Sequence, residues 1–211
     1  MLELFLSAFV SLFVVIDPPG CAPIYAGLSA DATRRQAIAM AARACVIAAI
    51  ILVIFALFGE KLLGALHIEL NAFRIAGGIM LFMIATEMVF EKRTQRREER
   101  AEKIMATPEV EDVSVFPMAM PMLAGPGSIA TIMLLTARAQ GIEQTFAVLG
   151  AMLLVLLLSF AALAAAGPLM RVLGDKVEAV ITRLLGVLLA ALAAQYVIDG
   201  VTAVLRFPAA T

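Results

Sequence analysis

The sequence predicts an all-α polytopic membrane protein with six transmembrane helices, arranged as two inverted three-helix repeats with helices 1 and 4 broken near the membrane midplane. Three observations predict this fold: an apolar composition, a similar order of motifs in the two halves, and polar interruptions inside apolar segments. Of the 211 residues, 63% are hydrophobic and 16% are charged, whereas soluble domains are about 45–50% apolar and about 25% charged. Residues 145–167 carry no charge over 23 positions, and crossing the bilayer core takes about 20 apolar residues.

Six apolar segments follow one another along the chain. The first starts with M-L-E-L-F-L, which lacks the basic residues that open a secretory signal, so we expect it to be a membrane segment. The second contains the uninterrupted apolar run 44–58. The third and sixth each contain R-x-x-G, the fourth contains A-G-P-G-S, and the fifth is the uncharged run noted above. The predicted spans are about 4–28, 36–58, 71–90, 114–137, 144–166 and 179–205.

One long polar stretch separates the third segment from the fourth. Its positive and negative charges are mixed and largely cancel, which indicates a solvated linker more than a lipid-binding basic patch. The chain therefore divides into a first repeat at 1–90, a charged linker at 91–113 and a second repeat at 114–211.

The two halves share motifs in the same order. The pair P-G at 19–20 recurs at 126–127, an offset of 107, and R-x-x-G at 74–77 recurs at 183–186, an offset of 109. Because each half has three spans, an odd number, the second half must enter the membrane from the opposite side. Inverted repeats of this kind form many secondary transporters, which bind their substrates where the repeats meet.

The distribution of Lys and Arg predicts the orientation. The loops after the first, third and fifth segments hold ten of these residues, Arg171 and Lys176 among them, and the opposite side holds three. By the positive-inside rule, the linker 91–113 is cytoplasmic and both termini lie outside. We therefore expect a multi-pass protein of the cell (inner, cytoplasmic) membrane.

The first interruption, I-D-P-P-G-C-A-P at 16–23, needs a reason, because unpaired backbone groups are tolerated at membrane depth only inside protein or beside a polar cavity. A half-helix that starts after such a break presents free N–H groups and partial positive charge, which suits an anion. We expect the ends near Gly20 and Cys21 and near Gly127 and Ser128 to face each other and bind a small solute with an anionic group, most naturally a carboxylate.

Asp17 has no acidic counterpart in the second half, where Ala124 takes the related position. A carboxylate at the centre of a membrane helix costs about 2.5–3.5 kcal/mol on insertion scales, so it usually has a partner or a function. Four roles remain open: binding a substrate ammonium group, carrying a coupling proton, pairing with Arg74, or capping the second half-helix. Arg74 itself either extends to the interface or acts in coupling or gating.

These stretches resemble the MarC family of integral membrane proteins. The resemblance covers 16–23, N-A-F-R-I-A-G-G-I at 71–79, and F-P-M-A-M-P-M-L-A-G-P-G-S-I at 116–129. It implies six helices in two inverted repeats and a relationship to exporters of the lysine-exporter type. One branch of the family transports small neutral amino acids such as glycine and alanine with a cation gradient. By position, the family motifs fall on Asp17, Pro18 and Gly20, and on Gly125, Pro126 and Gly127.

The function expected is secondary transport of a small amino-acid-like solute, coupled to H⁺ or Na⁺, by alternating access of one repeat against the other. The sequence contains no Walker A motif, no G-x-S-x-G and no H-E-x-x-H, so we expect neither ATP hydrolysis nor another enzymatic activity, and no cofactor. A net charge of −1 does not indicate a nucleic-acid partner. The alternative is a non-transporting membrane scaffold or regulatory protein, which accounts for the helices but not for the paired breaks.

Overall fold

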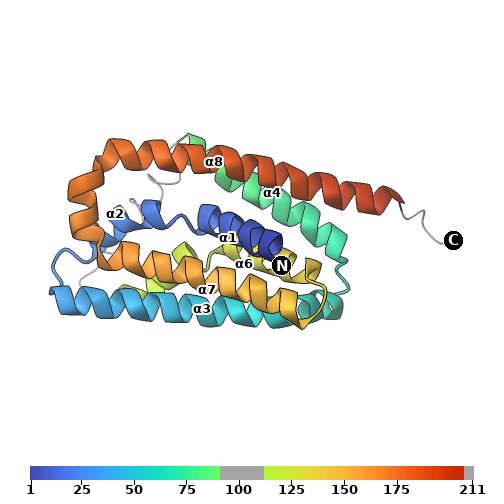
Figure 1. Cartoon of the computed structure of the whole chain (residues 1–211), viewed down its shortest axis with the longest axis horizontal. Helices are drawn as coiled ribbons and strands as arrows, with labels where there is room; N and C mark the ends of the chain where they lie inside the picture. Colours follow the sequence, from blue (N-terminus) through green and yellow to red (C-terminus); the bar gives the residue numbers. More distant parts are fainter. Residues whose placement is uncertain (91–111, 207–211) are drawn as a thin grey trace.

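The computed structural model describes residues 1–90 and 112–206, and this part of the chain is all-helical apart from short connections (Figure 1). Five helical stretches, one of them Leu2–Leu28, are long and apolar enough to cross a membrane, or six if the bent pair Ser114–Leu123 and Pro126–Arg138 counts as a single span. The elements are α1 (Leu2–Ile16), α2 (Pro18–Leu28), α3 (Arg34–Ala65), α4 (Leu70–Val89), η1 (Ser114–Leu123), α6 (Pro126–Arg138), α7 (Ile142–Ala164) and α8 (Ala166–Arg206).

The helix starts follow from local sequence. Thr33 caps α3 in a capping box: the Gln36 N–H donates to the Thr33 hydroxyl at 3.4 Å, and the Gln36 side chain accepts from the Thr33 N–H at 2.9 Å, which satisfies two backbone donors. Gly141 precedes α7 with a φ of 88, a left-handed conformation that costs glycine little. Prolines open α2 and α6, because the first helical position needs no N–H donor.

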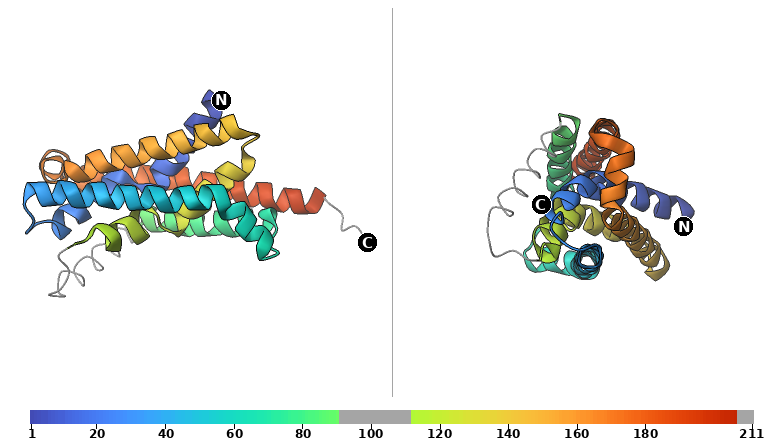
Figure 2. Two further views of the ribbon diagram at one scale, coloured as in Figure 1. Left: turned by 90° about the horizontal axis from the view of Figure 1, so that it is seen from below. Right: turned by 90° about the vertical axis from the view of Figure 1, so that its left-hand side faces the viewer.

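The two interrupted elements lie at the centre of the bundle. One buried apolar cluster joins α1, α2, α3 and α7, and a second joins α1, α4 and α8; both include residues of α6. Seen end on, α4 and α8 lie together on one side and α3 and α7 on another, with α2 and α6 between them, whereas the N-terminal part of α1 projects outward (Figure 2). The junction of α1 with α2 and the start of α6 are therefore interior, and the start of α1 is not.

Helices α4 and α8 run antiparallel and pack along their lengths through glycines. A Cβ at Gly78 would lie 2.9 Å from the Ala193 carbonyl oxygen, and one at Gly200 would lie 3.1 Å from the carbonyl oxygen of Asn71. A Cβ at Gly186 would lie 3.1 Å from the Ala85 oxygen. Small residues at such contacts let two membrane helices approach closely.

The outer surface of the bundle is apolar. Along α3, large hydrophobic side chains recur at helical spacing and are about half exposed: Val46, Ile50, Ile54, Leu57 and Phe58. A soluble monomer rarely exposes such a continuous apolar surface, and in a bilayer this surface faces lipid.

Two boundaries differ from the sequence prediction. Residues 167–178, expected to form a loop with Arg171 and Lys176, are helical and belong to α8, which spans 41 residues. The charged residues of this stretch do not end the helix, which begins before the apolar span at Ala179. The first half of the fourth segment, expected as a helix, is irregular: the backbone of Phe116 and Met120 is extended. Each precedes a proline, which disfavours the helical conformation in the preceding residue.

Asp112 fixes the chain where the described part resumes. Its carboxylate lies 2.8 Å from the Arg43 guanidinium of α3 and accepts the Ser114 N–H at 2.9 Å. Partial burial tends to raise the pKa of Asp112, but the hydrogen bonds from Ser114 and the positive charge of Arg43 outweigh it, so the pKa lies below its usual value. The other residues of the 91–113 linker, except Val113, lie outside the described part.

Candidate functional site

Asp17 forms the first break, because it ends α1 and begins α2. Its backbone is left-handed (φ 59, ψ 66), and its N–H bonds the Phe13 carbonyl at 2.9 Å. Its Oδ1 accepts a hydrogen bond from the Gly20 N–H at 3.2 Å, as the side chain of an N-cap residue does. Asp17 is 1% exposed. Of the four roles open for Asp17, the structure contains the capping role, which is compatible with the others.

Gly20 and Cys21 complete this break. A methyl group at Gly20 would collide with the Asp17 carboxylate, 2.8 Å from its Cγ, so the cap needs a residue without a Cβ. The Cys21 thiol donates to the Ile16 carbonyl at 3.5 Å. In a continuous helix the Gly20 N–H would bond that carbonyl; here the thiol takes its place. Residues of the break itself therefore satisfy the Gly20 N–H and the Ile16 carbonyl.

The second break lies at Ala124 and Gly125, where η1 and α6 meet at an angle of 53°. Gly125 is the N-cap of α6 and supplies no side-chain hydrogen bond to it. A Cβ on Gly125 would collide with the Pro121 carbonyl oxygen, which accounts for the glycine. Gly127 and Ser128 form the first turn of α6, and both are buried. Unlike α2, α6 thus begins without a side-chain cap.

The two breaks meet in the middle of the bundle. A Cβ at Gly127 would lie 3.2 Å from Val15 Cγ1 and 2.7 Å from Ile84 Cδ1, so the first turn of α6 packs against the last turn of α1. In Figure 1 the α1–α2 junction and the start of α6 lie at a similar position along the bundle. Of the six predicted binding residues, Asp17, Gly20 and Cys21 belong to one break, and Gly125, Gly127 and Ser128 to the other.

Arg74 does not join this site. Its Nη1 donates to the Asn71 side chain, one turn earlier in α4, at 3.4 Å, and its buried Nε has no hydrogen-bond partner in the described part of the chain. No ion pair between Arg74 and Asp17 is found among the described residues, and the pairing of the two side chains stays a prediction. Asn71 lies opposite Gly200 of α8, near the outer end of the α4–α8 pair, which explains the separation.

A polar cluster at that end was missed by the sequence analysis. Arg138, the last residue of α6, lies 2.5 Å from Asp199 of α8, and its guanidinium stacks 4.9 Å from the centroid of the Tyr196 ring. Gln195 also donates to Asp199, at 2.6 Å. The spacing of positions 195, 196 and 199 on one helix was the available signal, but nothing in the sequence indicates that α6 ends beside it.

Thr131 was also missed. It lies one turn after Gly127 and Ser128 in α6 and is 0% exposed, and its hydroxyl has no hydrogen-bond partner among the described residues. The signal in the sequence was a second hydroxyl residue three positions after Ser128 in an apolar helix, a spacing that places both on neighbouring parts of one face.

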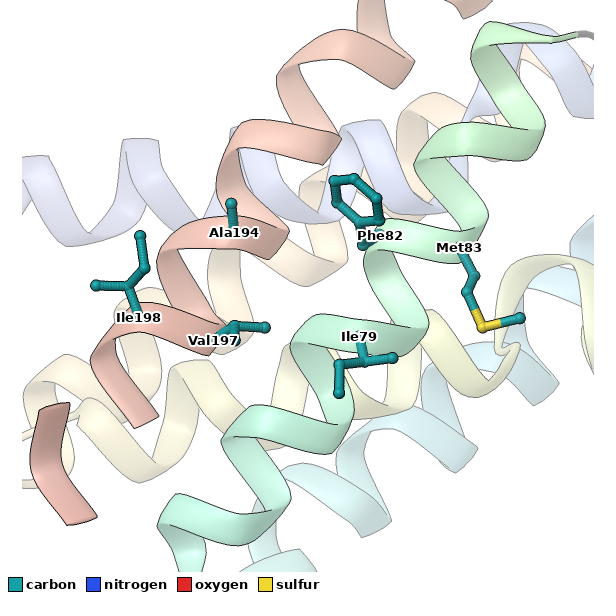
Figure 3. Close-up of a pocket in the computed structure, with 6 residues that line it drawn as sticks. All are labelled: Ile79, Phe82, Met83, Ala194, Val197 and Ile198. Carbon is teal, nitrogen blue, oxygen red and sulfur yellow. The ribbon is translucent and has the colours of Figure 1, made fainter. Parts of the chain in front are cut away.

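A groove of about 350 Å³ lies between α4 and α8, away from the two breaks (Figure 3). Its lining is entirely apolar and consists of Ile79, Phe82, Met83, Ala194, Val197 and Ile198. Such a lining offers no hydrogen bond to a polar solute, so this groove is not the binding site predicted from the breaks.

Long apolar helices, an apolar outer surface and a centre of interrupted helices define the class: this is an integral membrane protein that crosses the bilayer several times. A family comparison agrees. The model described as "MarC family integral membrane protein" matches residues 2–205, and the chain belongs to the MarC family, as its motifs predicted.

Several curated relatives are similar over nearly their whole length. A UPF0056 membrane protein of Methanocaldococcus jannaschii is 34% identical, over 95% of this chain and 97% of its own. YvbG of Bacillus subtilis, another UPF0056 membrane protein, is 34% identical over 92% of both chains. YhgN of Escherichia coli, a UPF0056 inner membrane protein, is 30% identical over 93% of this chain and 95% of its own. No solved structure matches this chain.

Proposed function

We propose that this protein is a secondary transporter that moves a small amino-acid-like solute across the cytoplasmic membrane, coupled to a proton or sodium gradient, by alternating access at the interface of two inverted repeats. The observation that carries the proposal is the contact between two helix interruptions inside an apolar bundle, one of which bears the buried carboxylate of Asp17. A non-helical backbone at membrane depth is usually found where it lines a substrate or ion path.

The arrangement of the chain supports inverted repeats. In Figure 1, α1 and α2 run along the bundle in one direction, whereas η1 and α6 run in the other. Helices α4 and α8, the third helices of the two halves, pack antiparallel through their glycines. A pseudo-two-fold axis in the membrane plane would relate the halves in this way.

The proposed binding residues are Asp17, Gly20 and Cys21 at the first break, with Gly125, Gly127 and Ser128 at the second. Buried within a low-dielectric environment, the Asp17 carboxylate suits the ammonium group of a zwitterion or a coupling cation, because an opposite charge offsets part of its desolvation cost. The helix N-termini suit an anionic group. We expect the solute to be small, because both breaks are closely packed by neighbouring side chains.

The outer polar cluster is the proposed gate on one side. Arg138 joins the end of α6 to Asp199 of α8, and Tyr196 lies close to Arg74 as well as to Arg138. Opening a path along α6 on this side would require the ion pair to separate. Arg74 would then act in gating, at a distance from Asp17. In this orientation the termini lie outside and the 91–113 linker is cytoplasmic, as the Lys and Arg distribution indicates.

Flux into proteoliposomes tests the function. Purified protein is reconstituted, and uptake of labelled glycine or alanine is measured with an imposed pH gradient, an imposed sodium gradient, or neither. Gradient-dependent uptake that exceeds uptake by protein-free vesicles is expected. Uptake equal to protein-free vesicles for both amino acids under all three conditions would refute the proposal and favour a scaffold or regulatory role.

A further inference from the structure

We propose that the α6 end alone, not both half-helix ends, binds the carboxylate of the substrate, and that the Thr131 hydroxyl completes this subsite. The inference deepens the proposed transport function and rests on it. It assigns opposite chemistry to the two breaks, which the pseudo-symmetry of the two halves would otherwise make equivalent.

The α2 end already holds an anion from the chain itself. The Asp17 carboxylate accepts the Gly20 N–H, and the Cys21 N–H bonds the Asp17 carbonyl at 3.1 Å. A substrate carboxylate placed there would compete for the same donor and would be repelled by a like charge in a buried site. The positive end of α2 is therefore neutralised before any substrate binds.

The α6 end differs at each of these points. Its N-cap, Gly125, contributes no side chain, and Pro126 has no N–H. The first hydrogen bond of the helix runs from the Ile129 N–H to the Gly125 carbonyl at 3.0 Å. The N–H groups of Gly127 and Ser128 precede this bond, and the first N–H groups of a helix have no acceptor within it. Both residues are buried. No carboxylate among residues 1–90 and 112–206 caps this end, so its partial positive charge is available to a ligand.

Thr131 supplies an independent indication of a ligand. Two hydroxyl groups in other apolar helices bond the carbonyl four residues earlier: Thr86 bonds Phe82 at 2.8 Å, and Ser159 bonds Val155 at 2.9 Å. Within α6 itself, Thr136 bonds Ile132 at 2.9 Å. The Thr131 hydroxyl makes no such bond and has no other partner among the described residues, although it is fully buried. Buried hydroxyls without partners are uncommon, because the desolvation cost is not recovered.

The helix geometry directs this hydroxyl toward the break. Residues 127, 128 and 131 fall on neighbouring parts of one helix face, and side chains on a helix lean toward its N-terminus. Val15 and Ile84 cover Gly127 in this conformation, so the subsite is occluded here, and substrate would enter when α6 separates from α1. Alternating access requires such an occluded conformation.

Three substitutions at two positions of α6 test the assignment. Thr131→Val removes the unpartnered hydroxyl at nearly constant volume, Thr131→Ser restores a hydroxyl, and Thr136→Val is the matched control because its hydroxyl is already bonded within the helix. Binding of alanine and of alaninamide, which lacks the carboxylate, is measured for each reconstituted variant. A hydrogen bond to a charged group predicts that Thr131→Val weakens alanine binding about tenfold or more. Thr131→Ser should restore much of it, and Thr136→Val should bind like the wild type.

The two probes separate a carboxylate subsite from general damage. Thr131→Val should not weaken binding of alaninamide further, and its thermal stability without ligand should equal or exceed that of the wild type. Unchanged alanine affinity in Thr131→Val, or an equal loss for alanine and alaninamide, would overturn the assignment while leaving transport intact. A wild-type protein that binds neither glycine nor alanine would contradict the proposed function, and this inference with it.

Discussion

Gly20→Ala should destabilise the protein, although alanine is ordinarily the better helix residue. In an unobstructed helix the exchange of glycine for alanine stabilises by about 0.5–1 kcal/mol. At Gly20 the new methyl group would lie 2.8 Å from Asp17 Cγ and 3.0 Å from Oδ1, so the carboxylate must move away. The lost cap costs about 0.5–2 kcal/mol, and overpacking a buried site costs about 1–3 kcal/mol. The net loss expected is about 1–4 kcal/mol.

Gly27→Ala is the matched control in the same helix, because no atom lies within 4 Å of a Cβ at that position. It should be neutral or stabilise the protein by up to about 1 kcal/mol. Unfolding of both variants in detergent, followed by far-ultraviolet circular dichroism, measures the difference. Opposite signs are expected for the two substitutions. If Gly20→Ala is as stable as Gly27→Ala, the Asp17 cap does not hold the break together.

Substitutions at three further residues have expected outcomes. Asp17→Asn keeps an N-cap side chain and should alter stability little, whereas Asp17→Ala should lose about 0.5–2 kcal/mol; gradient-driven alanine uptake by Asp17→Asn at wild-type rates would remove the charge from the mechanism. The pKa of Asp112 is lowered on folding. The stabilisation that Asp112 contributes to the folded state is therefore fully present above the pKa of the unfolded state and is lost as the pH falls through the pKa of the folded state. Asp112→Asn should therefore lower the free energy of unfolding by up to about 1 kcal/mol at neutral pH, since the ion pair with Arg43 is partly exposed, and should not change it in acid. A stability difference between the variant and the wild type that stays constant across this pH range would contradict the expectation. Asp199→Asn, which removes one charge of the pair with Arg138, should change stability by less than about 1 kcal/mol but accelerate alanine exchange in counterflow; unchanged exchange would argue against a gate there.

Much of the architecture was predictable because the membrane imposes strong constraints on sequence. The uncharged run 145–167 predicted α7, and the patterns I-D-P-P-G and A-G-P-G-S placed both interruptions within a residue or two of where they lie. These signals are local: proline removes a donor and glycine permits a close approach wherever they occur. The capping of α2 by Asp17 is also a local signal, since an Asp side chain commonly accepts a hydrogen bond from the N–H three residues later at the start of a helix.

What the sequence could not supply depends on packing between distant segments. The partner of Arg138 is Asp199, and no periodicity in either helix indicates the pairing. The missing hydrogen bond of the Thr131 hydroxyl is visible only in the structure, where Thr136 of the same helix bonds the Ile132 carbonyl. The helical state of 167–178 was not predicted, because its charged residues were interpreted as a loop, whereas a helix can continue beyond its membrane span.

Labelling of Cys21 tests most directly whether the two breaks line a path for solute. In Cys45→Ala, Cys21 is the sole cysteine, and it is 0% exposed in the occluded conformation. During transport in proteoliposomes, a small water-soluble methanethiosulfonate reagent should modify Cys21, and saturating alanine should slow the modification. Active alanine transport by this variant without any modification of Cys21, or with a modification rate that alanine does not alter, would show that the solute crosses elsewhere.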